Sequence, residues 1–363
     1  STVFPSPPLV RSPGAAVLVP VVLTIPALLI GVTAPFAGLI VDKVDRKRLL
    51  LIALVAYAVV GTAPLYLPSL QAILISRVLV GVCEAAIMTC ATTLIGDYWS
   101  GARRSRYLSL QTLVAALSAT VFLALGGALG AQGWRTPFWV YAVALVLVPL
   151  TAKLIWQPHA HRRSAGRRLQ PLPWRLLLTP CLVTFIGGVV FYALIVELSF
   201  VLTGVGFDSP AAIGGVSALM SVATAAGSIG FARLMHRTPR SLLPIEFVLS
   251  GIGFALVFAT ESVPVIAIGA VVAGFGTGML LPTLLTWAVN RLDFDQRGRG
   301  TGLWTGSLFL GEFVCPLLIA AIGAGVGGLR PAIGVLAVLA ALMAGVSALV
   351  ARRNSVPLNV TEG

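Results

Sequence analysis

Eleven long apolar runs dominate the sequence and limit what it can fold into. They cover roughly residues 15–41, 49–67, 71–96, 107–130, 138–156, 176–202, 211–235, 242–260, 264–289, 301–323 and 331–350. Each run is continuous rather than alternating, and each can cross ~30 Å of hydrocarbon as a helix. Hydrophobic residues make up 58% of the chain, more apolar surface than a soluble domain can bury. The sequence therefore predicts an all-α polytopic membrane protein.

The cations predict how these helices are oriented. Of the 25 Lys and Arg residues, 21 fall in alternate loops or in the C-terminal tail. The positive-inside rule places those loops in the cytoplasm. We therefore expect a multi-pass protein of the cell's inner membrane, with a cytoplasmic C-terminus and residue 1 on the outer side. This asymmetry accounts for the net charge of +13, so nucleic acid is not an expected partner.

The runs divide into two halves. The predicted organisation is an N-terminal bundle at 1–156 with five visible helices, a cytoplasmic linker at 157–174, a C-terminal bundle at 175–353 with six helices, and a tail at 354–363. An odd number of spans and an initial Ser suggest that a first helix is missing, and a natural eleven-span protein is the alternative. The stretch FARLMHRTPRSLL of the second half occupies the place that GLIVDKVDRKRLL holds in the first. Parallel repeats of this kind place a binding site between the halves, near the membrane midplane.

Several motifs resemble those of the major facilitator superfamily. The cytoplasmic signature of that family is Gly, three residues, Asp, a cation, any residue, Gly and two cations, and it matches Gly38, Asp42, Lys43, Arg46 and Lys47. Asp45 departs from it, because the family usually has Gly there. The stretch RVLVGVCEAA at 77–86 resembles a second signature, and GWR at 133–135 also fits. The resemblance covers nearly the whole chain except helix one, and implies two six-helix bundles and secondary transport by alternating access.

The resemblance also implies a cytoplasmic gating latch. In the family, the carboxylate at the place of Asp42 faces the N-terminus of helix eleven, here near residues 300–304, where the helix dipole attracts it. Arg46 would pair with Asp97. The full predicted latch comprises Gly38, Asp42, Lys43, Arg46, Lys47 and Asp97. A solvated loop is the alternative; it explains the cations but not the two aspartates or the Gly spacing.

Charged residues inside the runs predict the functional site. Ionisable side chains are costly in hydrocarbon and usually face the bundle interior, so we expect Arg77, Glu84, Glu197 and Glu312 to mark proton coupling or the substrate cavity. Arg77 and Glu84 are seven residues apart and share a helix face. A buried carboxyl that moves relative to an Arg changes its proton affinity, which would couple transport to protons. Glu246 lies about one turn inside the cytoplasmic end of its helix, and we expect it to snorkel.

The substrate class is left between two alternatives. The helix-five signature of family antiporters is degraded here: SATVFLALGGAL keeps Gly126 and Gly127 but has Phe122 and Leu123 in place of Gly-Pro. Several intramembrane glutamates against one Arg favour proton-coupled efflux of amphipathic or cationic compounds. A proton-coupled symporter of a small organic anion is the alternative. Cavity aromatics that could add apolar and cation–π contacts are Phe191, Tyr192, Trp304 and Phe309.

Other chemistry finds no support in the sequence. There is no Walker-type phosphate loop, so ATP is not expected to drive transport. The three histidines lie in cytoplasmic loops, and the four cysteines lie within apolar runs without a CxxC spacing. We expect no metal, no cofactor and no enzyme activity, and both a channel and an intramembrane enzyme are less favoured. The expected partners are a small-molecule substrate, protons and the lipid bilayer, and the expected state is a monomer.

Overall fold

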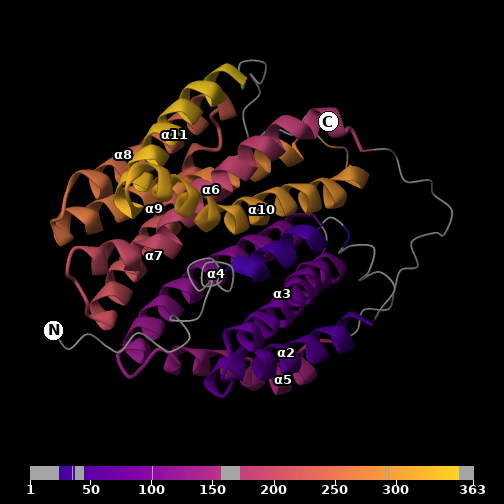
Figure 1. The fold of residues 1–363 in the computed structure, drawn as a ribbon. Helices are drawn as coiled ribbons and strands as arrows, with labels where there is room; N and C mark the ends of the chain where they lie inside the picture. Colours follow the sequence, from indigo (N-terminus) through magenta and orange to yellow (C-terminus); the bar gives the residue numbers. More distant parts are fainter. Residues whose placement is uncertain are drawn as a thin grey trace.

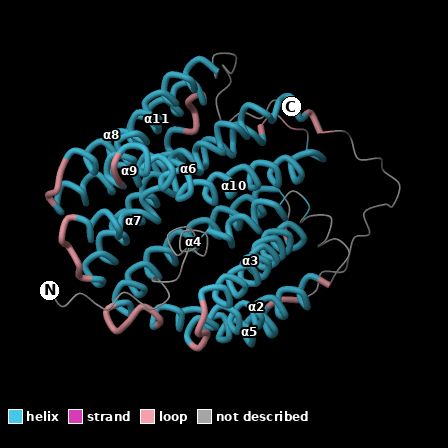
Figure 2. The backbone as a smooth tube through the Cα atoms, viewed as in Figure 1, coloured by secondary structure: helices cyan, strands magenta, loops and turns pink. Residues whose placement is uncertain are grey.

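The computed structural model describes residues 24–34, 36, 45–99, 101–156, 172–290, 292 and 294–350. Nine helices within these ranges are long and apolar enough to cross a membrane, and shorter apolar helices cover Thr24–Ala34 and Leu117–Gly130. Every one of the eleven predicted runs therefore contains a helix, and no strand occurs in the described ranges (Figure 2). The predicted all-α membrane fold is confirmed. The expectation of a missing helix concerns residues before the described part.

The helices follow the predicted runs closely. After the Thr24–Ala34 helix come α2 (Arg46–Thr62) with the short η2 (Ala63–Leu65), α3 (Leu70–Tyr98), α4 (Gly101–Gly130), η3 (Thr136–Ala142) with α5 (Val143–Leu154), α6 (Trp174–Gly204), α7 (Pro210–Leu234), α8 (Pro239–Ala259), α9 (Val263–Val289), α10 (Phe294–Val326) and α11 (Leu329–Val350). Side-chain caps begin several of them: the hydroxyls of Ser69 and Ser209 accept from the backbone N–H groups of Ala72 and Ala212.

The helices gather into two groups along the chain (Figure 1). In the first half, α2 packs against α3 and α5, around a core that includes Leu50, Leu54 and Cys90. In the second half, α8 packs against both α9 and α11, α7 against α9, and α10 against α6. The second half contains the larger continuous core, with Phe247 and Phe254 fully buried at its centre. Most of the predicted linker at 157–174 lies outside the described residues.

An arginine ties two helix ends of the first half together. Gly133 adopts a φ of 143°, which a side chain would disfavour, and turns the chain between α4 and η3. Two residues later, Arg135 donates from Nη1 to the Leu65 carbonyl at 3.0 Å and from Nη2 to the Leu67 carbonyl at 3.1 Å. The start of the last helix in this half is therefore tied to the end of the α2–η2 segment.

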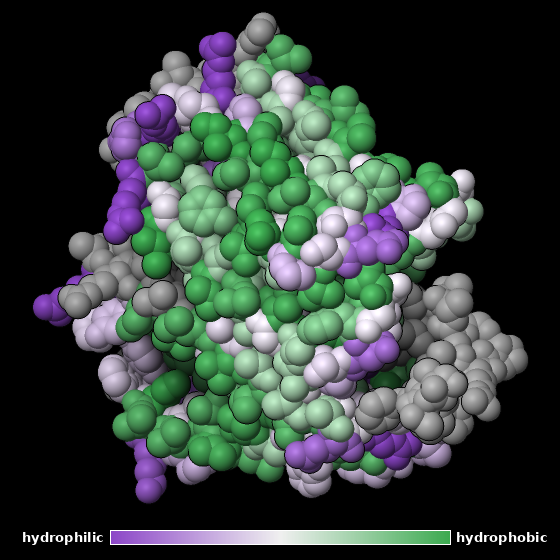
Figure 3. Space-filling view, turned by 90° about the vertical axis from the view of Figure 1, so that its left-hand side faces the viewer, coloured by the Kyte–Doolittle hydropathy of each residue, from purple (hydrophilic) through white to green (hydrophobic). Residues whose placement is uncertain are grey.

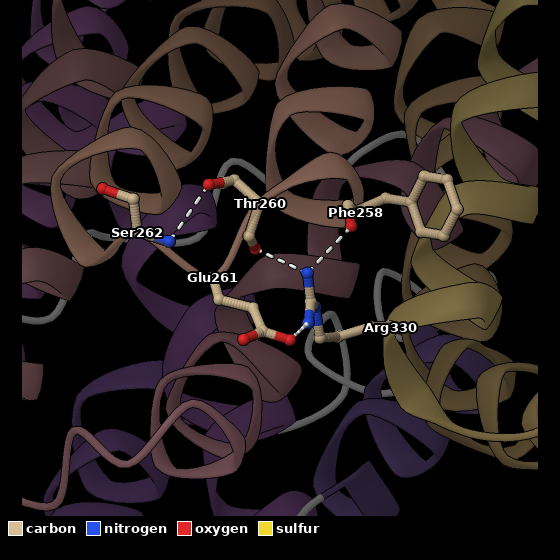
Figure 4. Close-up of polar contacts among 5 residues, drawn as sticks. All are labelled: Phe258, Thr260, Glu261, Ser262 and Arg330. Carbon is tan, nitrogen blue, oxygen red and sulfur yellow. Dashed lines mark hydrogen bonds and ion pairs between the residues drawn. The ribbon is translucent and has the colours of Figure 1, made fainter.

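The second half repeats this arrangement (Figure 4). Gly328 has a φ of 136°, and Arg330 follows two residues later. The Nη2 group of Arg330 donates to the carbonyls of Thr260 at 2.6 Å and Phe258 at 3.1 Å, at the end of α8, while Nη1 lies 2.8 Å from the Glu261 carboxylate. A Gly-x-Arg turn thus ties the last helix of each half to an earlier one, the η3–α5 segment to α2–η2 in the first half and α11 to α8 in the second. This is structural support for the internal repeat that the sequence predicts.

Among the described residues, the two halves touch between α4 and α7 and between the Thr24–Ala34 helix and α10. Between α4 and α7, Thr120 donates to the Ser221 hydroxyl at 3.0 Å, and a Cβ at Gly127 would lie only 2.6 Å from the Gly214 Cα. On the other side, a Cβ at Gly31 would lie 3.2 Å from Leu310 of α10. Glycines at these positions allow helices from different halves to approach closely.

Large apolar side chains cover much of the surface. Figure 3 shows a broad hydrophobic surface on one face, with hydrophilic residues mainly toward its edges. Leu154 is 70% exposed and Ile52 66%, which would be unfavourable in water. Lipid is the solvent that suits such a surface.

Candidate functional site

Arg77 is a buried cation of the first half, only 4% exposed. Its Nη2 group donates to the carbonyls of Val60 and Gly61, at 3.0 and 2.9 Å, near the end of α2. The guanidinium also lies over two rings of η3, 5.3 Å from the centroid of Phe138 and 5.0 Å from that of Tyr141. A Cβ at Gly61 would overlap the Tyr141 ring, so the glycine makes room for this arrangement. Arg77 is therefore fixed to its own half.

Glu84 lies two turns further along α3 and is half-buried. It is close enough for its charge to act on the Tyr192 hydroxyl of α6 and on the Glu312 carboxyl of α10. Glu312 is 6% exposed. Neither carboxyl has a hydrogen-bond partner within the described part of the chain. The structure thus places two of the carboxyls that the sequence singles out, one from each half, within electrostatic range of each other.

Glu197 lies on α6, nearer its C-terminal end, and is 9% exposed. Its charge and that of Glu312 both act on the thiol of Cys315, which is fully buried one turn beyond Glu312 on α10. The close packing of α6 and α10 explains this proximity, because a Cβ at Gly311 would lie 2.1 Å from the Phe185 carbonyl. Glu197 therefore extends the group of carboxyls toward the C-terminal end of α6.

The predicted cavity aromatics occupy different environments. The Tyr192 hydroxyl lies within electrostatic range of both Glu312 and Glu84. Phe191 borders a small cavity of about 10 Å³, together with Met220 and Phe254. Trp304 is 8% exposed and packs within the core of the second half, while Phe309 is half-buried.

Two tyrosines of the site were not identified from the sequence. Tyr57 of α2 and Tyr141 of η3 have ring centroids 5.1 Å apart, and both hydroxyls lie within the electrostatic reach of Arg77 and Glu84. A signal was available, because a tyrosine inside an apolar run carries a hydroxyl that needs a polar environment.

Only part of the predicted latch can be examined. Gly38, Asp42 and Lys43 lie outside the described residues, and the side chain of Asp97 is not described. Lys47 donates from Nζ to the Ala152 carbonyl at the end of α5, at 2.8 Å. The pairing of Arg46 with Asp97 stays a prediction.

Glu246 corrects another expectation. Its side chain is fully buried between α8 and α9, so the prediction that it snorkels is wrong. The reason is packing: α8 is covered by both α9 and α11 at this depth. No cluster of three or more His, Cys, Asp or Glu side chains that could hold a metal occurs among the described residues.

Comparison with known proteins decides the family. The model of the Major Facilitator Superfamily matches residues 2–243 and again residues 181–362, which together span nearly the whole sequence. The chain belongs to the major facilitator superfamily. The superfamily model and the curated relatives describe transporters, so this superfamily member is a multi-pass membrane transporter and not an enzyme.

The curated relatives transport different compounds. The chain is 26% identical over 319 residues to the 3-(3-hydroxy-phenyl)propionate transporter of Escherichia coli K12, covering 81% of this chain and 76% of that protein. It is 21% identical over 161 residues to the quinolone resistance protein NorA of Staphylococcus aureus, covering 43% of this chain and 42% of NorA.

Solved structures share the fold of this superfamily member. The human organic anion transporter MFSD10 aligns with a TM-score of 0.69 and 19% identity, over 92% of this chain and 84% of that one. A bacterial homologue of the human lysosomal transporter Spinster, in an inward-facing and occupied conformation, aligns with a TM-score of 0.64 and 15% identity, over 94% and 98%.

Proposed function

We propose that this superfamily member is a proton-coupled secondary transporter that exports amphipathic or cationic small molecules by alternating access. It works as a monomer in the cell's inner membrane, with its C-terminus in the cytoplasm. The observation that carries the proposal is the carboxyl pair formed by Glu84 of α3 and Glu312 of α10, one from each half.

The pair supplies a physical basis for coupling. Two carboxylates repel each other strongly in a medium of low dielectric constant, so the pair holds a proton while the two groups are close. Alternating access moves one half against the other, which changes their separation. Arg77 is hydrogen-bonded within the first half, so its distance from Glu84 stays nearly constant while its distance from Glu312 changes. The proton affinity of the pair then differs between the two conformations.

The driving force is adequate for such a transporter. A membrane potential of 100 mV supplies about 2.3 kcal/mol for each charge that crosses. At about 1.4 kcal/mol per tenfold ratio, one proton sustains a roughly fifty-fold substrate gradient from the voltage alone.

The charges around the site favour a cationic substrate. Arg77 already donates to two backbone carbonyls and lies over two aromatic rings, so it is poorly placed to bind a substrate anion. Glu84, Glu197 and Glu312 supply negative charge near the site, and Tyr192 supplies an aromatic face of the kind that cations bind. An amphipathic cation complements this combination.

A second candidate is a proton-coupled symporter of a small organic anion. One specific observation favours it: among the curated relatives described above, the one that matches over most of this chain is named for an aryl propionate, which is an anion at neutral pH. In that case the proton neutralises a carboxyl of the pair and lets the anion approach.

One experiment separates the two candidates. The full-length protein is reconstituted in liposomes, and the movement of a lipophilic quaternary ammonium ion and of an aryl propionate is measured with the pH gradient imposed in each direction. Export requires that the cation moves against the proton flow. Accumulation of the propionate together with protons would establish the symporter instead. If neither flux responds to pH, the coupling proposal is wrong.

A further inference from the structure

Glu246 is a titratable group that the proposed site does not use. Its side chain is 0% exposed, and it lies on α8 in contact with α9, away from the carboxyl pair. One carboxyl oxygen, Oε1, lies 2.5 Å from the Thr283 hydroxyl, and the other, Oε2, has no hydrogen-bond partner in the described residues. Within those residues no charged side chain acts on it; burial and the Thr283 contact define its environment. A carboxylate in hydrocarbon without a countercharge is strongly unfavourable.

The number of protons available at Thr283 favours a protonated Glu246. The Thr283 hydroxyl lies 3.0 Å from the Met279 carbonyl, one turn back on α9, as well as 2.5 Å from Glu246. A carbonyl can only accept, and a hydroxyl has a single proton to donate. When Thr283 donates to Met279, the proton between Thr283 and Glu246 must belong to the carboxyl. With a neutral Glu246 both contacts can be hydrogen bonds, because Glu246 donates to Thr283 and Thr283 donates to Met279; a carboxylate would leave one of the two acceptors without a proton.

This hydrogen-bond chain lies beside a break in α9. Pro282 has no N–H, so the carbonyl four residues earlier, on Gly278, loses its partner within the helix. The Ser228 hydroxyl of α7 donates to that carbonyl instead, at 2.8 Å. The helix is thus braced on both sides of the proline, by α7 at Gly278 and by α8 at Thr283.

We propose that Glu246 keeps its proton throughout the transport cycle and that this neutral carboxyl, through Thr283, positions α9 at Pro282. Glu246 is then a positioning residue rather than a proton carrier. The inference requires only that the protein transports a substrate, so it stands apart from the proposal that Glu84 and Glu312 couple transport to protons.

The test compares variants of the full-length protein in liposomes. The amide of Glu246→Gln also donates to Thr283, so this variant should keep wild-type transport and the wild-type pH profile. Glu246→Leu and Thr283→Val remove the hydrogen bond, and each should lower the maximal rate by about tenfold. Because neither side chain is expected to touch the substrate, KM should not change. The double variant should be no worse than either single variant, since both remove the same interaction.

Thr277→Val is the matched control. Its hydroxyl lies on the same helix but donates only to the Ala273 and Gly274 carbonyls of α9 itself, so its loss should leave the rate unchanged. Infrared spectroscopy supplies a readout that survives poor folding of Glu246→Leu. The difference between wild type and Glu246→Gln should contain the carbonyl stretch of a protonated carboxyl, and this band should persist to alkaline pH.

Three results would overturn the proposal. The first is a Glu246→Gln protein that loses pH-driven accumulation but keeps exchange, because Glu246 would then carry the coupled proton. The second is an infrared band that disappears near neutral pH. The third is a Thr283→Val protein that transports as well as Thr277→Val.

Discussion

Asp45, which lies within the cytoplasmic signature, also caps the N-terminus of α2. It occupies the position where the superfamily usually has Gly, and in the structure its carboxylate accepts from the Arg48 backbone N–H at 3.0 Å, at the first turn of α2. An N-cap of this kind stabilises a helix by satisfying a free donor. It explains one of the two aspartates that a solvated cationic loop leaves unexplained.

The cap makes a prediction about stability. Asp45→Ala should lower the free energy of unfolding by about 1 kcal/mol, whereas Asp45→Asn, which keeps the acceptor oxygen, should change it little. Thermal unfolding of the purified variants in detergent measures the difference. Equal losses in both variants would show that charge, not capping, is what matters at this position.

Variants of Arg330 and Glu261 can distinguish the stability that comes from hydrogen bonds to carbonyls from the stability that comes from an exposed ion pair. Arg330→Ala removes two donors from the end of α8 and should cost about 1–2 kcal/mol of stability. Glu261 is 79% exposed, so Glu261→Gln should change stability by less than about 0.5 kcal/mol. The same thermal assay compares them. If Glu261→Gln lowered stability more than Arg330→Ala does, the ion pair rather than the hydrogen bonds to the carbonyls would tie α8 to α11.

At the level of elements, the contact between α4 and α7 must change if the halves move against each other. The hydroxyls of Thr120 and Ser221 are 3.0 Å apart, close enough that cysteines at both positions should form a disulfide on oxidation. In a protein whose four native cysteines are replaced, the oxidised double variant should stop transporting and recover with reductant. The two single-cysteine variants are the controls. Undiminished transport by fully cross-linked protein would show that α4 and α7 do not separate there.

The helices were predictable from the sequence because each apolar run must satisfy its backbone within the membrane, and a helix does so locally. Side-chain partners were less predictable, because they depend on contacts between distant segments. Arg77 illustrates this: the sequence places it in a membrane helix, but its partners at Val60, Gly61 and Tyr141 come from two other elements. The expectation that Glu246 snorkels is wrong for the same reason, since nothing in its own helix shows that α9 and α11 cover it.

At the scale of the whole molecule, the account depends on charged groups that belong to different halves. Arg77 and Glu84 both lie on α3, and Glu312 lies on α10. A relative movement of the halves therefore changes the distance from Glu312 to each of the other two, while the distance between Arg77 and Glu84 stays the same. Arg77→Lys should therefore be damaging despite its equal charge, because a lysine cannot both donate to two carbonyls in a fixed plane and stack on the η3 rings. We expect a fall in transport rate of at least about tenfold, measured as uptake into liposomes. Wild-type rates in Arg77→Lys would show that the charge alone suffices.

The most direct test of the central claim measures accumulation and exchange in the same proteoliposomes for Glu84→Gln and Glu312→Gln. A glutamine fixes the uncharged state, so at the coupling residue pH-driven net accumulation should fall to background. Exchange of labelled for unlabelled substrate should persist there, because exchange needs no proton cycle. Glu261→Gln, at an exposed position just after the C-terminal end of α8, is the control and should keep both activities. The account predicts that at least one of the two variants separates exchange from accumulation in this way; full pH-driven accumulation in both would contradict it.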